Sequence, residues 1–266
     1  MRIRVSSWFI FCLFCLSASL VGQSNPSLSW QRFESGVSAS FRGISAVSDQ
    51  VVWVSGSQGT VLLTKDGGKS WKRLEVPQAE GLDFRDVHAQ DGKTAYLLSA
   101  GSGELSRIYK TVDGGQSWRM LFKNPHPEGF LNGLAFWDST HGIAMGDPVK
   151  RRLFVLTTND AGESWERTPA DRLPEVKEGE YGFAASGTSL VAAGQQHAWI
   201  GTGGAAARVF RTQDRGQSWS VSETPIAAGA PSAGIFSLYF RDTQNGWAIG
   251  GDYQQPEKAG GNLART

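Results

Sequence analysis

Cysteine is nearly absent from the sequence: the only two, Cys12 and Cys15, lie close to the N-terminus. The rest of the chain has no thiol, which excludes a disulfide framework and a cysteine-ligated metal there. Leu13 and Phe14, both large, precede Cys15, so no lipid anchor is predicted at that cysteine. Long segments with apolar residues at helical spacing are also missing after the N-terminal stretch, which disfavours a helical fold.

The chain also lacks a dominant charge. Its formal net charge is +1. Without Arg2 and Arg4, the 26 basic residues become 24 against 25 acidic ones, or about −1. This balance offers no general electrostatic attraction to nucleic acid or to an anionic membrane. Any charged binding site must therefore be a local cluster.

The N-terminus has the composition of a secretory signal. Arg2 and Arg4 supply the positive start, and residues 8–21 supply an apolar core. This core is shorter than the roughly 20 residues that cross a membrane. We predict a signal peptide over residues 1–23 and a periplasmic or extracellular protein over residues 24–266, with no membrane insertion after signal removal; an uncleaved anchor is the alternative.

One motif, Thr-x-Asp-x-Gly-x-Ser-Trp, occurs four times, at residues 64–71, 111–118, 158–165 and 212–219. The steps between its tryptophans are 118 − 71 = 47, 165 − 118 = 47 and 219 − 165 = 54. A period near 50, built from short strands, is typical of propeller blades. The sequence therefore predicts an all-β fold, a β-propeller of four-stranded blades.

The Asp, Gly and Trp of the motif each have a structural role in a hairpin. The carboxylate can close the turn on nearby backbone N–H groups, the glycine can take a positive φ, and the tryptophan can bury its ring between blades. The structural set is Asp66, Gly68, Trp71, Asp113, Gly115, Trp118, Asp160, Gly162, Trp165, Asp214, Gly216 and Trp219. One carboxylate per turn is too few for calcium, which takes six to eight oxygens, so no metal is predicted.

Three further strands repeat around each motif. The expected first strands are residues 41–47, 84–87, 131–136 and 235–240. The expected second strands are residues 52–56, 95–98, 142–146, 198–201 and 246–250. The expected third strands, which run into the motif, are residues 61–64, 108–111, 154–157 and 209–212.

Both ends of the chain carry parts of a blade. Residues 30–34 match the strand after a motif, as in residues 71–75, yet no motif precedes them. Residues 265–266 match the entry to a motif, and none follows. We expect four full blades and a partial fifth in a C-terminally truncated chain. The intact protein would have six to seven blades, the last completed by the N-terminal strand. A five-blade ring closed by the Trp30 strand is the alternative.

The repeated turn is similar to the Asp-box, or bacterial neuraminidase repeat. The amino-acid sequence resembles bacterial relatives of the photosystem II stability/assembly factor over residues 51–71, 81–118, 130–147 and 192–219. In photosynthetic members the resemblance implies an assembly role, with a photosystem subunit held at a membrane surface through an arginine patch. It implies here an exported, non-catalytic scaffold for a protein or peptide partner. We expect a monomer that binds no nucleic acid, and no cofactor, since no Gly-x-Gly-x-x-Gly opens a helix.

Blade geometry predicts where a binding site would lie. Starts of first and third strands share one face of a propeller with the loops between second and third strands. The candidate residues on this channel face are Arg42, Arg85, Arg107, Arg152, Arg208, Asp147 and Asp252. Arginines around a channel mouth suit an anion or an acidic peptide. The alternative is that each arginine pairs with a carboxylate of a neighbouring blade.

The enzymatic alternative is a sialidase-like glycoside hydrolase, because those enzymes share Asp-boxes. Such enzymes need three arginines around a carboxylate, an acid Asp and a Tyr with its Glu partner, with the first arginine in Phe-Arg-Ile-Pro. Here the sequence Phe41-Arg42-Gly43-Ile44 lacks the proline, and Phe84-Arg85-Asp86-Val87 departs further. No catalytic residue is therefore assigned.

Overall fold

The computed structural model describes residues 29–184 and 187–266. The predicted signal peptide, residues 1–23, and both cysteines lie outside these residues. The chain divides into two compact units, Met1–Glu34 and Ser35–Thr266. All strands that the structure describes belong to the second unit.

The strands form five antiparallel sheets, and four of them are four-stranded blades. Blade 1 is β1 (Phe41–Ala46), β2 (Val52–Gly56), β3 (Val61–Thr64) and β4 (Lys72–Leu74). Blade 2 is β5 (Asp83–Ala89), β6 (Ala95–Ala100), β7 (Arg107–Thr111) and β8 (Arg119–Lys123). Blade 3 is β9 (Leu131–Phe136), β10 (Gly142–Val149), β11 (Arg152–Thr158) and β12 (Glu166–Arg167). Blade 4 is β14 (Leu190–Ala193), β15 (His197–Gly201), β17 (Arg208–Thr212) and β18 (Ser220–Glu223).

The last sheet, blade 5, combines propeller strands with two short additions. Its propeller strands are β19 (Ala230–Phe240), β20 (Gly246–Asp252) and β21 (Leu263–Arg265). The additions, β13 (Glu180–Tyr181) and β16 (Gly203–Gly204), pair beside the N-terminal part of β19. Two 3-10 turns, η1 (Gly103–Leu105) and η2 (Ala170–Arg172), lie in connections. The longer 54-residue step of the motif thus reflects a longer connection from blade 3 to blade 4.

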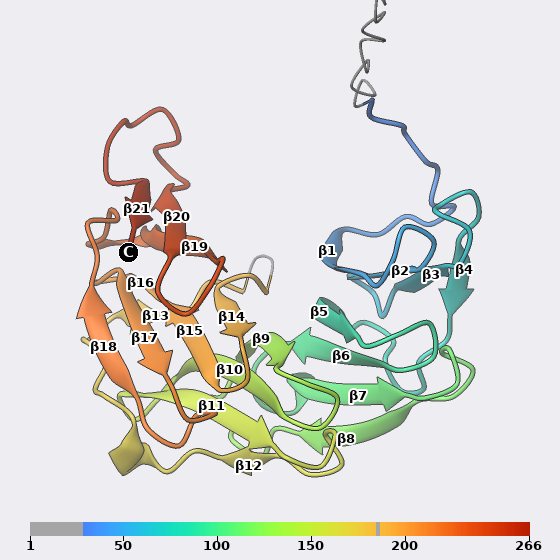
Figure 1. Cartoon of the computed structure of the whole chain (residues 1–266), viewed down its shortest axis with the longest axis horizontal. Helices are drawn as coiled ribbons and strands as arrows, with labels where there is room; N and C mark the ends of the chain where they lie inside the picture. The colour runs from blue at the N-terminus through green and yellow to red at the C-terminus, as the bar shows by residue number, and fades with distance from the viewer. Residues whose placement is uncertain (1–28, 185–186) are drawn as a thin grey trace, which may run out of the picture. The chain divides into compact units, whose positions relative to one another are not determined.

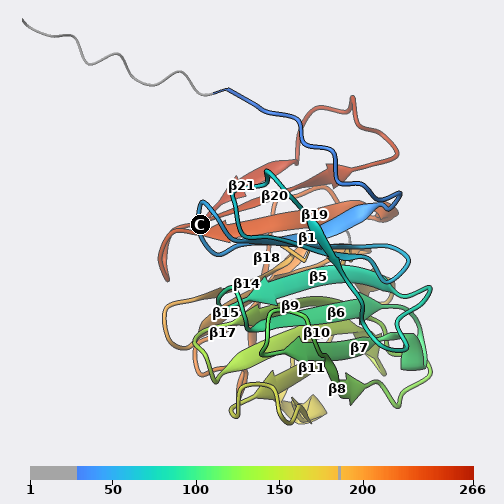
Figure 2. The same ribbon diagram turned by 90° about the vertical axis from the view of Figure 1, so that its right-hand side faces the viewer.

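Within the unit Ser35–Thr266 the blades follow one another side by side. Their first strands, β1, β5, β9, β14 and β19, contact one another in turn, so they line the inside of the arc (Figure 1). The turned view shows the strands of successive blades stacked in layers (Figure 2). This is the blade arrangement that the repeat predicts.

The motif turn is closed by side-chain hydrogen bonds, as in blade 2. The Thr111 hydroxyl accepts the backbone N–H of Gly115 at 2.9 Å and donates to Asp113 Oδ1 at 2.8 Å. Asp113 in turn accepts the hydroxyl and backbone N–H of Ser117. These bonds, the Ser117 hydroxyl first, lower the pKa of Asp113 to about 2. Gly115 has a φ of +78°, which a Cβ would oppose.

The motif tryptophans pack against the second strand of the preceding blade. Trp118 of blade 2 meets Trp53 of blade 1 edge-on, with ring centroids 6.2 Å apart. Trp165 of blade 3 shares a core cluster with Tyr96 of blade 2. The turns of blades 2 and 3 therefore fix both their own hairpins and the interface with the blade before them.

Two expectations differ from the structure. Residues 30–34 were expected to form a strand, but none is assigned to them, and Trp30 is fully exposed. A lone strand gains no ladder hydrogen bonds, so the pattern of residues 30–34 cannot form structure without a neighbour. Conversely, β14 was not expected, because its short Leu-Val-Ala-Ala sequence is a weak strand signal. It forms a strand because it pairs with β15.

The hydrogen bonds of the motif turn predict how removing one hydroxyl changes the free energy of unfolding. Thr111→Val keeps the shape of the side chain and leaves the buried N–H of Gly115 without its acceptor. We expect a loss of about 1–3 kcal/mol in the free energy of unfolding. Denaturant unfolding checks this, with Thr94→Val, outside the box turn, as control. Equal stability of the two variants would contradict the role of the hydroxyl.

Candidate functional site

The seven candidate residues all lie at strand ends on the side opposite the motif turns. Arg42 and Arg85 lie near the starts of β1 and β5, and Arg107, Arg152 and Arg208 are the first residues of β7, β11 and β17. Asp147 lies near the end of β10, and Asp252 ends β20. Their side chains nonetheless have very different surroundings.

The structure brings two of the candidate arginines to one carboxylate. Arg85 Nε donates to Asp83 Oδ2 at 2.8 Å, and Arg42 Nε lies 3.9 Å from Asp83 Oδ1. That second separation is too long for a hydrogen bond, and within residues 29–184 and 187–266 neither atom has another hydrogen-bond partner. Two guanidinium groups thus share one carboxylate, which leaves an excess positive charge and an unsatisfied donor at the inner strands.

A connection from another part of the chain lies against this cluster. Arg85 Nη1 donates to the backbone carbonyl of Ala184 at 2.6 Å, across 99 residues of sequence. Two residues earlier, the backbone N–H of Gly182 donates to Asp147 Oδ1 at 3.1 Å, and Asn132 Nδ2 donates to the same oxygen at 2.7 Å. The connection from blade 3 to blade 4 therefore crosses the inner strands and lies beside both Arg85 and Asp147.

Aromatic rings continue the same surface toward blade 5. Phe183 contacts Tyr181, Phe236 and Tyr253, with ring centroids 5.2 to 6.3 Å apart. The Tyr181 hydroxyl donates to the carbonyl of Pro231. The Tyr253 ring is largely exposed, so this cluster offers aromatic contact area next to the charged residues.

Arg208 shows the alternative that the sequence left open for each arginine, a pair with a carboxylate of a neighbouring blade. Its guanidinium is buried and bonds both oxygens of Glu180, which is also buried. The Thr202 hydroxyl donates to the same carboxylate at 2.6 Å. Through this buried ion pair, Arg208 anchors the long connection at blade 4.

The remaining candidates are spread apart. Arg152 pairs with Glu175 at 2.8 Å. Arg107 donates to the backbone carbonyls of Glu104 and Gln78. Asp252 accepts the backbone N–H of Gln254 at 3.0 Å in its own turn. These three residues serve local contacts, so the site that the structure assembles is smaller than the predicted ring: Arg42, Asp83, Arg85, Asp147 and the connection above them.

The sequence predictions missed Asp86, a buried carboxylate next to Arg85. Asp86 Oδ2 accepts the backbone N–H of Leu134, on the next blade, at 2.8 Å, and Oδ1 accepts that of Val87 at 2.9 Å. Burial raises the pKa of Asp86 to about 7, against the effect of these bonds. A Cβ at Gly187 would lie 2.5 Å from Oδ2, so the connection passes here only as glycine. The sequence offered one sign of this buried carboxylate: Asp86 stands at the position in its strand that Gly43 occupies in blade 1.

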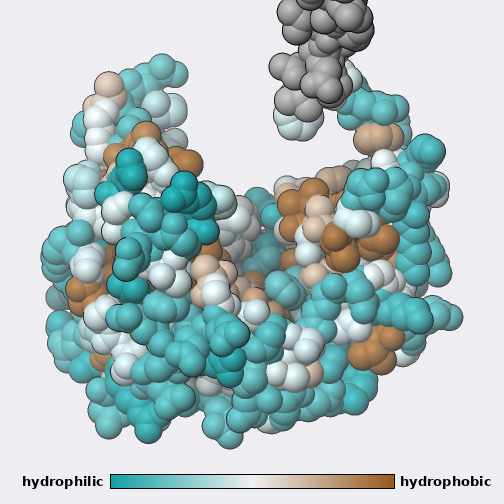
Figure 3. Space-filling view, in the orientation of Figure 1, coloured by the Kyte–Doolittle hydropathy of each residue, from teal (hydrophilic) through white to brown (hydrophobic). Residues whose placement is uncertain are grey.

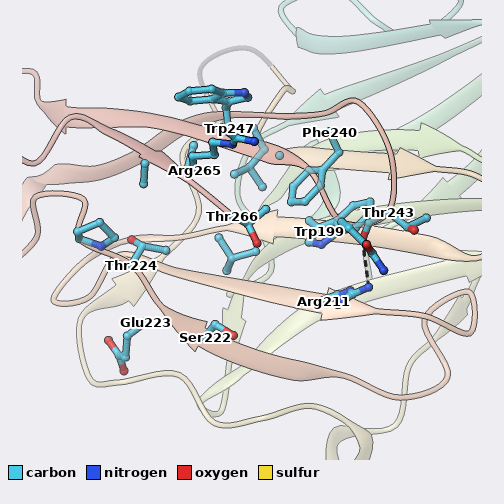
Figure 4. Close-up of a pocket in the computed structure, with 17 residues that line it drawn as sticks. Trp199, Arg211, Ser222, Glu223, Thr224, Phe240, Thr243, Trp247, Arg265 and Thr266 are labelled. Carbon is cyan, nitrogen blue, oxygen red and sulfur yellow. Dashed lines mark hydrogen bonds between the residues drawn. The ribbon is translucent and has the colours of Figure 1, made fainter.

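A separate cavity of about 300 Å³ lies between blades 4 and 5, away from the arginine pair. Figure 4 shows Trp199 and Phe240 side by side in it, and Arg211 donating to the carbonyl of Thr243. Trp199 holds the second-strand position that Trp53 holds in blade 1, where a motif tryptophan packs. The cavity therefore occupies the place of an inter-blade aromatic contact.

Over the residues that the structure describes, no three His, Cys, Asp or Glu side chains are grouped as metal ligands would be. In the same part of the chain, no helix is both long and apolar enough to cross a membrane.

The comparisons with known proteins agree with the blade pattern. Residues 28–129, which contain blades 1 and 2, match the family described as "Photosynthesis system II assembly factor YCF48". The chain has the fold of an Asp-box β-propeller, and in its first two blades it is similar to this family. The expected resemblance and the expected fold are therefore confirmed.

Two curated relatives of this propeller are both named "Photosystem II assembly lipoprotein Ycf48". The one from Picosynechococcus sp. is 27% identical, covering 91% of this chain and 77% of the relative. The one from Synechococcus sp. (strain CC9902) is 26% identical, covering 62% of this chain. The latter match spans 46% of that relative, so the chain corresponds to about half of its length.

One solved structure shares this fold, and another is similar in sequence over most of its length. An ancestral GH74 enzyme matches with a TM-score of 0.54 at 12% identity, covering 85% of this chain and 32% of that one, which shows the fold alone. The structure described as "YCF48 bound to D1 peptide" matches with a TM-score of 0.43 at 16% identity, covering 90% of this chain and 98% of that one.

The buried pair predicts a large effect of removing one charge from this propeller. Arg208→Met leaves Glu180 buried without its partner, and we expect a loss of about 3–5 kcal/mol in the free energy of unfolding. The double variant Arg208→Met/Glu180→Gln should recover much of that loss. Denaturant unfolding of both variants checks this; a double variant that is no more stable than Arg208→Met would show that the two side chains do not act as a pair.

Two buried groups on β5 predict opposite pH dependences. The pKa of Asp86 is raised from 3.8 to about 7, so its contribution to stability is full at low pH and is lost as pH rises through 7. Burial lowers the pKa of His88 from 6.5 to about 4, so its contribution is lost as pH falls toward 4.

Asp86→Asn removes only the first of these effects. Between pH 4 and 7, we expect the wild type to lose stability steadily relative to this variant. Unfolding free energies of both proteins at several pH values in that window check the prediction. A difference that does not change with pH would show that Asp86 titrates normally.

Proposed function

We propose that this propeller is an exported, non-catalytic scaffold that holds a segment of a protein partner on its channel face, as an assembly factor does. The observation that carries the proposal is the pairing of Arg42 and Arg85 around the single carboxylate of Asp83. Two partly exposed guanidinium groups that share one carboxylate leave an excess positive charge, which suits a further carboxylate, either an acidic side chain or a chain terminus. The names of the curated relatives support a role of this kind.

The surroundings of the arginine pair suit a peptide better than a small anion. Beyond the pair lie the half-buried connection at Ala184 and the aromatic cluster of Phe183 and Tyr253. A charged group can bind at the arginines while neighbouring side chains of the same partner pack on the rings. A partner segment that combines an acidic group with apolar residues fits this surface.

The sialidase-like alternative finds less support in the geometry. Such an enzyme needs three arginines around one substrate carboxylate, and of the candidate arginines only Arg42 and Arg85 lie together. Arg208, which the sequence offered as a further arginine, is occupied by Glu180. No specific arrangement in residues 29–184 and 187–266 favours a hydrolase, so we propose the scaffold alone.

Capture of partners from the native cell envelope tests this proposal. The protein and the variant Arg42→Gln/Arg85→Gln serve as baits, and Arg73→Gln/Arg119→Gln, on outer strands β4 and β8, is the matched control. We expect one partner to be enriched by the wild type and by the control, and at least tenfold less by the channel-face variant. A tenfold loss corresponds to about 1.4 kcal/mol of binding free energy.

Two results would contradict the proposal. One is capture of the same proteins in the same amounts by all three baits, with each bait folded by circular dichroism. The other is turnover of a fluorogenic sialoside or related glycoside by the wild type that the channel-face variant loses, because this would make the same surface catalytic.

A further inference from the structure

A hairpin turn in blade 3 carries two adjacent basic residues in the left-handed backbone region. The turn joins β10 to β11, where Val149 pairs with Arg152. Its two central residues, Lys150 and Arg151, have φ of +52° and +63°. A Cβ opposes this conformation, so two-residue hairpin turns favour Asn-Gly at these positions. We call residues 149–152 the basic hairpin.

The equivalent turn of blade 1 has the residue that this backbone favours. There the carbonyl of Ser57 accepts the backbone N–H of Thr60 at 3.2 Å, and the turn residues Gln58 and Gly59 have φ of +57° and +64°. Glycine adopts this conformation without steric opposition. Blade 3 instead has Arg151 at the position of Gly59, and its backbone is strained there.

Another strained arginine shows how contacts can offset such strain. Arg215, in the motif turn of blade 4, has a φ of +59°. Its Nε donates to the carbonyl of Gln195 at 2.7 Å, and its Nη2 lies 3.4 Å from Asp138 Oδ2 of blade 3. Lys150, by contrast, is exposed, and its side chain has no hydrogen bond or ion pair within residues 29–184 and 187–266. Its place in the turn is therefore not explained by contacts within this part of the chain.

The basic hairpin carries more positive charge than its surroundings neutralise. Arg152 Nη1 lies 2.8 Å from Glu175 Oε1, and Arg151 Nη2 lies 3.3 Å from Oε2 of the same carboxylate. Arg152 also donates through Nε to the carbonyl of Ala170 at 3.0 Å, whereas the Arg151 side chain is 61% exposed. Three cations thus share one exposed carboxylate, and exposed ion pairs of this kind are weak.

We propose that the basic hairpin binds an acidic segment of a protein partner. This site is additional to the pair of Arg42 and Arg85 and does not depend on it. The surface over β11 and β12 of the same blade is mainly hydrophilic, so charge and not apolar burial carries the contact (Figure 3). Lys150 and Arg151 are consecutive in the chain, and carboxylates spaced along a peptide match such a row better than a single phosphate does.

Amide chemical shifts of the isotope-labelled protein test this site residue by residue, with a peptide of six glutamates as the probe. We expect the amides of Arg151, Arg152 and Val176 to shift and saturate as the peptide is added, because Val176 donates its N–H to the Arg151 carbonyl. Added salt should weaken the binding, since the groups are exposed.

Lys150→Gln/Arg151→Gln keeps two long side chains and removes their charge. It should weaken binding of the peptide by about tenfold, measured at the amides of Arg152 and Val176. Arg42→Gln/Arg85→Gln should bind the peptide at the hairpin as the wild type does. This comparison separates the hairpin from the proposed function of the channel face, so each can fail without the other.

Lys150→Asn/Arg151→Gly gives the hairpin the residues that its backbone favours. We expect the midpoint of thermal unfolding to rise by about 2–4 °C, because the strain is removed, while the peptide again binds about tenfold more weakly. Gln58→Asn, which creates Asn-Gly in the turn of blade 1, is the matched control and should leave peptide binding at the hairpin unchanged.

Four results would overturn the proposal. The six-glutamate peptide could shift no amide of the hairpin, or Lys150→Gln/Arg151→Gln could bind it as tightly as the wild type. A six-glutamine peptide or inorganic phosphate could shift the same amides equally, which would show that a row of carboxylates is not what the hairpin recognises. Finally, a lower unfolding midpoint in Lys150→Asn/Arg151→Gly would show that the turn is not strained for the sake of binding.

Discussion

Packing of each blade's second strand against the next blade is the contact on which the rest of the structure depends. Trp53, Tyr96, Ile143 and Trp199 all occupy this position, and all are buried. The motif turn supports the contact, because its tryptophan packs against the same position of the preceding blade. Stability is thus built from neighbour to neighbour, as in other repeat proteins, and a blade with only one neighbour leaves half of its apolar surface uncovered.

Because the motif turns and the contacts between blades hold the fold, the opposite side of the blades is free to vary. The motif turns must keep their Asp, Gly and Trp, whereas the channel face is made of connections of different lengths. The connection from blade 3 to blade 4 uses this freedom: Glu180 fixes it to blade 4, and Ala184 brings it to Arg85. A binding surface can therefore differ between relatives of the same fold, since function lies in the site and not in the blades.

Much of the fold follows from the sequence, and less of the site does. The four motifs and the alternating strands around them predict blades 1 to 4 because turn chemistry and apolar spacing are local signals. The pairing of Arg42 and Arg85 on Asp83, the crossing of the long connection and the burial of Asp86 depend on contacts between residues far apart in the chain. Sequence position placed Arg208 on the same face as Arg42, but it could not show that Glu180 occupies it.

Amide hydrogen exchange of the captured complex would test most directly whether the channel face is the working surface. The account predicts that a bound partner slows exchange at the starts of β1 and β5 and in residues 180–184, and leaves the motif turns unchanged. Slower exchange confined to the motif turns or to the outer strands β4 and β8 would contradict it, because the partner would then bind on the other side of the blades.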